Sequence, residues 1–114
     1  MFYDALSLLK EMIKTPSVSR EESKVADLLL NFFKEKLGFC NINRIENNIW
    51  IASKNFDSSK PSILLNSHID TVKPVDGWIR DPYSAETEGD FIYGLGSNDA
   101  GASVVALLSA FRVL

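Results

Sequence analysis

Apolar residues recur every three to four positions in two stretches near the start of the chain, and this spacing predicts two amphipathic helices. Leu9 and Ile13 share one face of the first helix, which is predicted over 3–14. The second helix opens at residues 19–22, where a serine precedes a glutamate by three positions as in a capping box, and it stops at Gly38. Each helix is expected to bury one apolar face and to leave a charged face in solvent.

Shorter apolar runs follow the two helices and predict strands. Strands over 39–45 and 48–53 are joined by a tight turn of a kind that asparagine tolerates. The run 62–67 is apolar without regular alternation, which is typical of a strand that a sheet buries on both faces. A loop over 70–82 comes next, and then a hairpin over 84–93 that turns at a Gly-Asp pair.

The last segment, 102–114, is apolar on nearly every side, so as a helix it must be buried on nearly every side. It ends without a capping residue, a glycine or a polar tail, and we expect the chain to be cut in mid-fold. Helices and strands alternate along the chain. That order predicts an α/β fold in which helices flank a mixed sheet.

Composition and charge limit the classes of function. The 114 residues, of which 46% are hydrophobic and 24% charged, suffice for one small core. A net charge of −3 with scattered lysines offers no footprint for nucleic acid, and no apolar run approaches the roughly 20 residues of a membrane span. Asp4 and Lys10 within the first helix argue against a signal peptide. The single Cys40 forms no internal disulfide, so we expect a cytoplasmic location.

The candidate chemistry centres on His68, the only histidine of the chain, which closes the predicted strand 62–67. Asp70 follows two residues later, and side chains at i and i+2 of a strand point to the same face. A histidine that binds a metal through one ring nitrogen commonly donates from the other to such a carboxylate. The alternatives are a histidine satisfied within the core and an aspartate that accepts backbone amides in a turn.

A second acidic residue, Asp99, lies in a glycine-bearing loop, 94–101, just before the apolar helix. It could join His68 and Asp70 in a metal site, or it could cap the helix that follows. The glycines of this loop lack the lysine and the Ser/Thr of a phosphate-binding loop. One histidine and two aspartates at loop mouths indicate part of a metal site, not a complete one.

Four ordered motifs resemble the aminoacylase/acetylornithine-deacetylase family of di-zinc amidohydrolases and exopeptidases. These motifs are residues 65–72, Gly77-Trp78, 81–83 and 89–99, and the Thr-Pro-Ser-Val-Ser sequence of residues 15–19 fits as well. The family also includes succinyl-diaminopimelate desuccinylase and glutamate carboxypeptidases, and acetylornithine deacetylase is the member that this chain resembles most.

The resemblance implies roles for three residues. His68 looks like a ligand of one zinc ion, Asp99 like the carboxylate that bridges two, and Asp70 like the catalytic acid that orients His68. In the family a cis peptide commonly follows the bridging aspartate, so it is expected at Asp99–Ala100. The implied cofactor is Zn²⁺, two ions per complete site, with Co²⁺ as an alternative. Zinc readily takes imidazole nitrogen and carboxylate oxygen as ligands.

The chain departs from the family pattern in two ways. The family often has an arginine at the position of Leu95 and Met-Lys-Gly at residues 100–102, where this chain reads Ala-Gly-Ala. The substrate is therefore less defined than the metal site. In addition, the family's general-base glutamate, its remaining acidic ligands and a second histidine lie later in the chain. Residues 1–114 are thus expected to be the N-terminal part of one catalytic domain, without the rest of that domain or the lid/dimerisation domain.

The expected function of the full-length protein is zinc-dependent hydrolysis of an amide bond that releases an amino acid from an N-acyl amino acid. An N-acetylornithine deacetylase of arginine biosynthesis comes first, and a dipeptidase or a succinyl-diaminopimelate desuccinylase is the alternative within the family. A non-catalytic α/β module is the alternative outside it. We expect a homodimer that binds a small N-acyl amino acid or a dipeptide, and neither nucleic acid nor membrane. The 114-residue fragment itself is expected to be inactive, to bind zinc weakly or not at all, and to self-associate.

Overall fold

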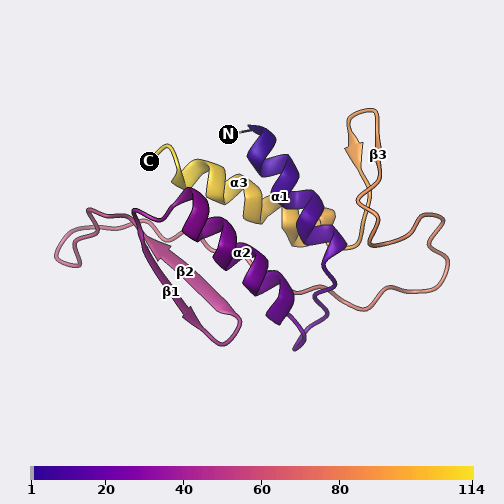
Figure 1. Cartoon of the computed structure of the whole chain (residues 1–114), viewed down its shortest axis with the longest axis horizontal. Coiled ribbons are helices and arrows are strands. Elements are labelled where there is room, and N and C mark those ends of the chain that lie inside the picture. Colours follow the sequence, from indigo (N-terminus) through magenta and orange to yellow (C-terminus); the bar gives the residue numbers. More distant parts are fainter. Residues whose placement is uncertain (1) are drawn as a thin grey trace.

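The computed structural model describes residues 2–114. Three helices form its body, joined by two short hairpins and long loops (Figure 1). The helices are α1 (Phe2–Lys14), α2 (Ser23–Lys36) and α3 (Ala102–Phe111), and a π-type turn, η1 (Ser97–Gly101), leads into α3. The hairpins pair β1 (Asn41–Ile45) with β2 (Asn48–Ala52) and β3 (Thr87–Glu88) with β4 (Phe91–Ile92). The α/β class predicted from the sequence is confirmed.

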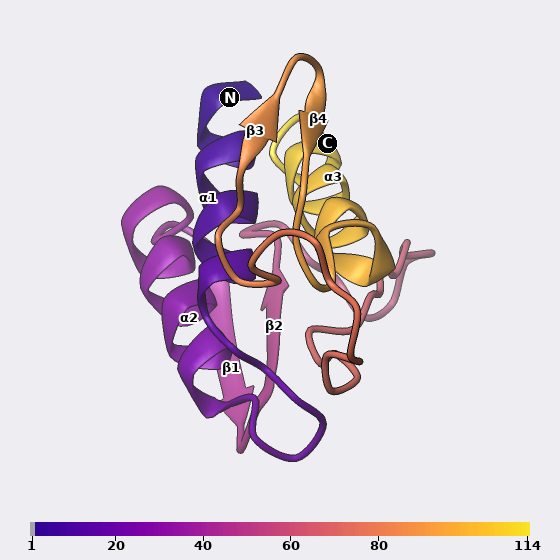
Figure 2. The ribbon, with the colours of Figure 1, turned by 90° about the vertical axis from the view of Figure 1, so that its right-hand side faces the viewer.

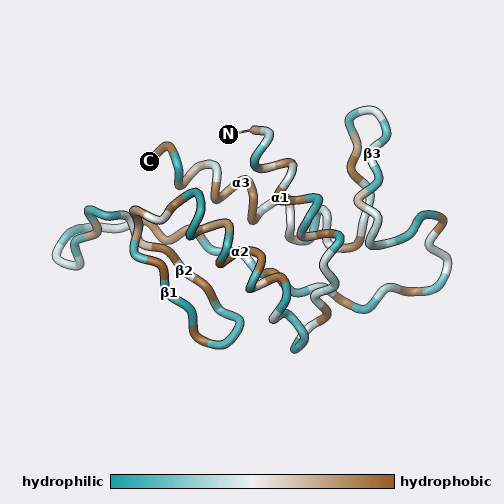
Figure 3. Tube along the Cα trace, viewed as in Figure 1, coloured by the Kyte–Doolittle hydropathy of each residue, from teal (hydrophilic) through white to brown (hydrophobic). Residues whose placement is uncertain are grey.

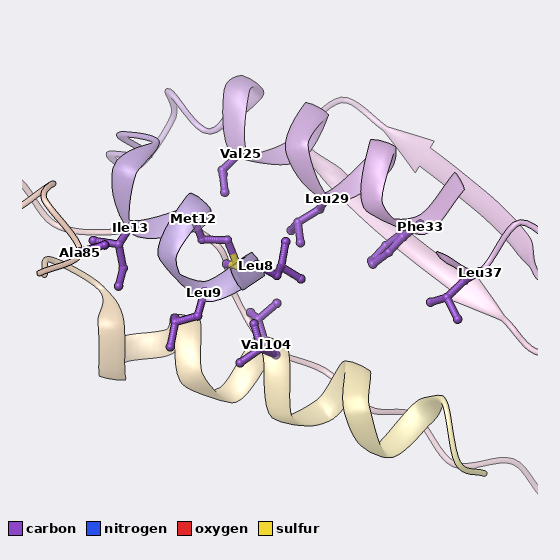
Figure 4. Packing of buried hydrophobic residues seen from close by; sticks show 11 residues of the cluster. Leu8, Leu9, Met12, Ile13, Val25, Leu29, Phe33, Leu37, Ala85 and Val104 are labelled. Carbon is purple, nitrogen blue, oxygen red and sulfur yellow. The ribbon is translucent and has the colours of Figure 1, made fainter. Parts of the chain in front are cut away.

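The core lies between the three helices, with α1 in the middle (Figure 4). Side chains of α2 reach α1 from one side and Val104 of α3 reaches it from the other (Figure 4). Buried residues of α1 recur at the helical spacing predicted for its apolar face. The buried residues of the three helices are Leu8, Leu9, Met12, Ile13, Val25, Ala26, Leu29, Phe33, Val104 and Val105.

Both predicted hairpins are confirmed to within one to three residues. In the first, Ile45 pairs with Asn48, so a two-residue turn connects the strands, and Glu46 takes a positive φ of 53° there. This hairpin lies along α2 (Figure 1). The second hairpin turns at Gly89, with a φ of 57°, and projects toward the end of the molecule opposite the first hairpin (Figure 1), the end that faces the viewer in Figure 2.

The capping box predicted at residues 19–22 is wrong. Helix α2 begins at Ser23, and its N-cap residue Glu22 makes no side-chain capping bond. The Glu22 carboxylate instead accepts the Arg20 amide at 2.7 Å and the Asn47 side-chain amide at 3.1 Å. The Ser19 hydroxyl bonds outside the helix altogether, to Asp70. The hydrogen bond of Ser19 to Asp70, a residue distant in the sequence, therefore replaces the predicted capping bond to the helix.

The buried strand predicted over 62–67 is also wrong for the part of the chain that the structure describes. This segment is extended but unpaired, and the Ile63 and Leu64 side chains are 79% and 86% exposed. A strand needs a neighbour for its backbone groups, and no segment within residues 2–114 supplies one. In place of one mixed sheet, the described strands form two separate antiparallel hairpins.

The molecule exposes more surface than a compact protein of its size. Its accessible area is 7866 Å², whereas a 12.7 kDa monomer has about 6,200 Å². Apolar stretches lie on the projecting loop between 70 and 82 as well as on the helices (Figure 3). In the described residues no helix combines the length and the apolar character that a membrane crossing requires.

Candidate metal centre

The structure places His68 between two carboxylates. Its Nδ1 lies 3.1 Å from Asp70 Oδ1 and 3.1 Å from the Asp70 carbonyl oxygen. Its Nε2 lies 3.0 Å from Asp99 Oδ1. The pairing of His68 with Asp70 was predicted from their spacing, and the structure brings the third candidate, Asp99, to the same ring.

The two ring nitrogens of His68 differ in their surroundings. Two oxygen atoms of Asp70 face Nδ1, and this favours a proton on that nitrogen that Asp70 accepts. In the neutral ring Nε2 then carries a lone pair, which points toward the side of Asp99. This is the tautomer in which a histidine can bind a metal through Nε2 while an acid orients the ring.

The pKa values follow from these contacts. Burial alone would lower the pKa of His68, but its hydrogen bonds with the Asp70 carbonyl and the Asp99 carboxylate outweigh it and raise the pKa above 6.5. The Ser19 hydroxyl, which donates to Asp70, lowers the pKa of that carboxyl below its usual value, and the nearby His68 adds to the effect. Asp70 is thus an ionised acceptor at neutral pH.

Asp99 reaches the site because the backbone leaves helical geometry just before α3. Asp99 and Ala100 have non-helical dihedral angles inside η1, and the peptide bond between them is cis, as the resemblance implied. Helix α3 takes Gly101 as its N-cap residue, without a side-chain capping bond. Asp99 therefore contacts His68 and does not cap the helix.

Gly96 allows the loop that carries Asp99 to lie close to the segment that carries Asp70. Its φ is 75°, and its carbonyl accepts the Gly101 amide at 2.8 Å. A Cβ at this position would lie 2.6 Å from Thr71 Cγ2. The glycine spacing that gave only a weak phosphate-loop signal in the sequence thus serves close packing beside the site.

We expect Gly96→Ala to lower the free energy of unfolding by about 2 to 4 kcal/mol, because it adds backbone strain and a steric clash. Gly89→Ala is the matched control, since Gly89 also has a positive φ but has open space around it. It should cost only the strain, about 1 to 2 kcal/mol. Urea unfolding of both variants measures the difference, and equal losses would show that the contact with Thr71 is unimportant.

A wide hollow opens beside His68 and Asp99, with a volume of about 700 Å³. Its other walls come from residues 66–67 and from Ala100, Ser103, Ala106 and Leu107. The exposed fractions of the His68 and Asp99 side chains are 53% and 90%. Both side chains are therefore accessible from the hollow, which is large enough for a small-molecule substrate.

The side chains present are of the kinds that bind zinc, but there are too few of them for a complete site. The 3.0 Å between His68 Nε2 and Asp99 Oδ1 is close to the roughly 3.4 Å edge of a tetrahedron with zinc-to-ligand bonds near 2.1 Å. A complete zinc site takes three or four protein ligands. Within residues 2–114 no group of three or more His, Cys, Asp or Glu side chains is arranged to hold a metal.

A family model described as "Peptidase family M20/M25/M40" matches residues 64–114, the segment that contains His68, Asp70 and Asp99. This segment of the chain is thus similar to the peptidase family. The resemblance found in the sequence motifs is thereby confirmed.

Several curated proteins are similar to this chain. A probable carboxypeptidase of Emericella nidulans is 37% identical over 92% of the chain and 26% of its own length. A succinyl-diaminopimelate desuccinylase of Blochmanniella floridana is 29% identical over 98% of the chain and 30% of its own length. An acetylornithine deacetylase of Buchnera aphidicola is 30% identical over 92% of the chain and 30% of its own length. The chain thus spans less than a third of the length of these relatives.

Sequence reasoning missed one member of the site. Ser19 donates to Asp70 across 51 positions of the sequence. Its local pattern indicated a helix cap, and no local signal points to a residue so distant in the chain.

Proposed function

We propose that this chain is the N-terminal part of the catalytic domain of a zinc-dependent amidohydrolase that releases an amino acid from an N-acyl amino acid. The observation that carries the proposal is His68, held at Nδ1 by Asp70 and facing Asp99 at Nε2. We further propose a cytoplasmic homodimer as the whole protein.

In this proposal His68 binds one zinc ion, Asp99 bridges two, and Asp70 fixes the tautomer and orientation of His68. Bound zinc would polarise the scissile carbonyl and lower the pKa of a water molecule, and Co²⁺ is the alternative metal. The chain's own part is to hold the two donor atoms 3.0 Å apart at the wall of an open hollow.

Three observations support the view that the site is completed by residues outside 1–114. The described residues offer two donors that face each other, the accessible surface exceeds that of a compact monomer, and the curated relatives are more than three times as long. We propose that the remaining zinc ligands and the general base come from the additional length that these relatives have.

N-Acetylornithine is our first proposed substrate, and arginine biosynthesis the pathway. The similarity to an acetylornithine deacetylase supports this choice, while the similarities to a desuccinylase and to a carboxypeptidase support the alternatives, N-succinyl-diaminopimelate and a dipeptide. Hydrolysis rates of the purified whole protein on these three substrates test the choice. Greater activity on either alternative would overturn it.

A non-catalytic α/β module is the second candidate, favoured by the small number of donors within residues 2–114. The nucleotide sequence that follows the codon for Leu114 separates the two candidates. An in-frame continuation with a Glu-Glu pair and a later histidine supports the enzyme, and a stop codon supports the module.

We expect Asp70→Asn in the whole protein to reduce turnover roughly 10- to 100-fold with the fold intact, because the ring of His68 loses its anionic partner. Steady-state kinetics and thermal unfolding of the same preparation measure the two effects. Asp57→Asn is the matched control, since Asp57 also accepts a serine hydroxyl, at 2.7 Å, but lies in a different loop. An unchanged rate in Asp70→Asn would remove Asp70 from the catalytic residues.

A further inference from the structure

Residues 17–19 run alongside Thr71 in a fixed register. The Thr71 amide donates to the Ser17 carbonyl at 2.8 Å, and the Ser19 amide donates to the Thr71 carbonyl at 3.1 Å. Between these two bonds, Val18 forms a parallel bridge with Thr71. The backbone of Ser19 is therefore fixed next to the residue that follows Asp70.

The Ser19 side chain uses this position to bond Asp70. Its hydroxyl donates to Asp70 Oδ2, whereas Asp70 Oδ1 is the oxygen that faces His68 Nδ1. The two carboxylate oxygens thus have different partners, one on each side. A second acceptor for the hydroxyl, the Thr71 carbonyl, is more distant at 3.4 Å.

The loop before α2 is itself held in place. The Glu22 carboxylate accepts the Arg20 amide with one oxygen and the Asn47 side-chain amide with the other, at 2.7 and 3.1 Å. Asn47 lies in the turn between β1 and β2, so the loop is joined both to α2 and to the first hairpin. Ser19 is consequently presented to Asp70 by a braced segment.

We propose that Ser19 is a positioning residue that sets the orientation of the Asp70 carboxylate and, through it, that of the His68 ring. The inference rests on the proposed function and deepens it. The terminal torsion of an aspartate is broad, so a carboxylate held at one oxygen alone can rotate. A hydroxyl on the second oxygen restricts that rotation, and the Oδ1 atom is kept in line with His68 Nδ1.

The test compares Ser19→Ala with wild type in the whole protein, by zinc affinity in competition with a chelator and by steady-state kinetics. We expect zinc affinity and kcat to fall about 3- to 10-fold, less than the 10- to 100-fold typical of residues that touch a ligand directly, because Ser19 is one contact further away. KM and the unfolding temperature should change little, since the backbone bonds of Ser19 remain. Unchanged zinc affinity and kcat would overturn the proposal.

Two further variants isolate the hydroxyl. Ser19→Thr keeps the hydroxyl, and Ser19→Val replaces it with a methyl group in a side chain of nearly the same volume as threonine. The threonine variant should therefore retain wild-type zinc affinity, and the valine variant should not. Ser59→Ala is the matched control, because it removes a serine-to-aspartate bond of 2.7 Å in the loop of residues 57–60 and should have no effect on zinc. Equal losses in the threonine and valine variants would assign Ser19 a packing role and overturn the proposal.

A double-mutant cycle separates this inference from the function on which it rests. In an Asp70→Ala background both acceptor oxygens are gone, so Ser19→Ala should have no additional effect on zinc affinity. An effect of the same size as in wild type would overturn the role through Asp70 and leave the zinc enzyme standing. Wild-type protein that neither binds zinc nor hydrolyses any of the three substrates would instead overturn the proposed function, and this inference with it.

Discussion

Replacing Asp99 with alanine in the whole protein is expected to remove both zinc ions together and to abolish hydrolysis. A carboxylate has two oxygen atoms, and in the proposed role each binds one ion, so a single substitution removes a ligand from both. The fold should survive, because the Asp99 side chain is 90% exposed and α3 is not capped by it. Metal content by mass spectrometry after dialysis, together with the rate, measures the outcome.

Asp76→Ala is the control for this prediction, since Asp76 is an exposed aspartate of the loop 70–82. That variant should retain both ions and the wild-type rate. Loss of a single ion from Asp99→Ala, with the other still bound, would contradict the bridging role. If Asp99→Ala lost the folded structure as well as both ions, Asp99 would have a structural role instead.

His68→Ala is expected to cost one zinc ion and to abolish activity, with a loss well beyond the roughly 100-fold upper range seen for residues that only orient a ligand. The imidazole of His68 is the only imidazole ligand that this chain can supply, because it contains one histidine. Its side chain is half exposed at 53%, so alanine should leave the core intact. The metal content and the near-ultraviolet circular dichroism spectrum test both statements.

Asn66→Ala serves as the control for the histidine, because Asn66 lines the same hollow without belonging to the proposed ligands. It should keep both ions, whatever its effect on KM. If His68→Ala also kept both ions, His68 would not be a ligand, and the proposed metal centre would be wrong at its central residue.

The sequence predicted correctly those structural features that depend on the spacing of residues a few positions apart. The apolar stripe of α1, the two hairpins and the adjacency of His68 to Asp70 each depend on residues a few positions apart, and each is confirmed. The contact of Asp99 with His68 spans 31 positions, and the residue pattern alone favoured Asp99 as a cap of the following helix over a metal ligand. The family resemblance decided between the two interpretations by implying that both residues bind zinc.

The two errors have a common physical cause. Residues 19–22 have the local pattern of a helix cap, and residues 62–67 have that of a buried strand. In both segments the conformation depends on a partner that is distant in the sequence, and a local pattern contains no information about that partner. Ser19 finds Asp70, which satisfies its hydroxyl in place of the helix amides. The segment 62–67 finds no neighbour among the described residues and stays unpaired.

The unpaired segment 62–67 leads directly into His68, and this has a thermodynamic consequence. Any strand that pairs with it would bond its unpaired backbone groups and would also fix the backbone that carries the imidazole. In the proposed site, strand pairing and zinc binding would then share a coupling free energy, and each would strengthen the other by the same factor. Zinc would act as an assembly effector for the sheet, and a chelator would loosen the strand as well as empty the site.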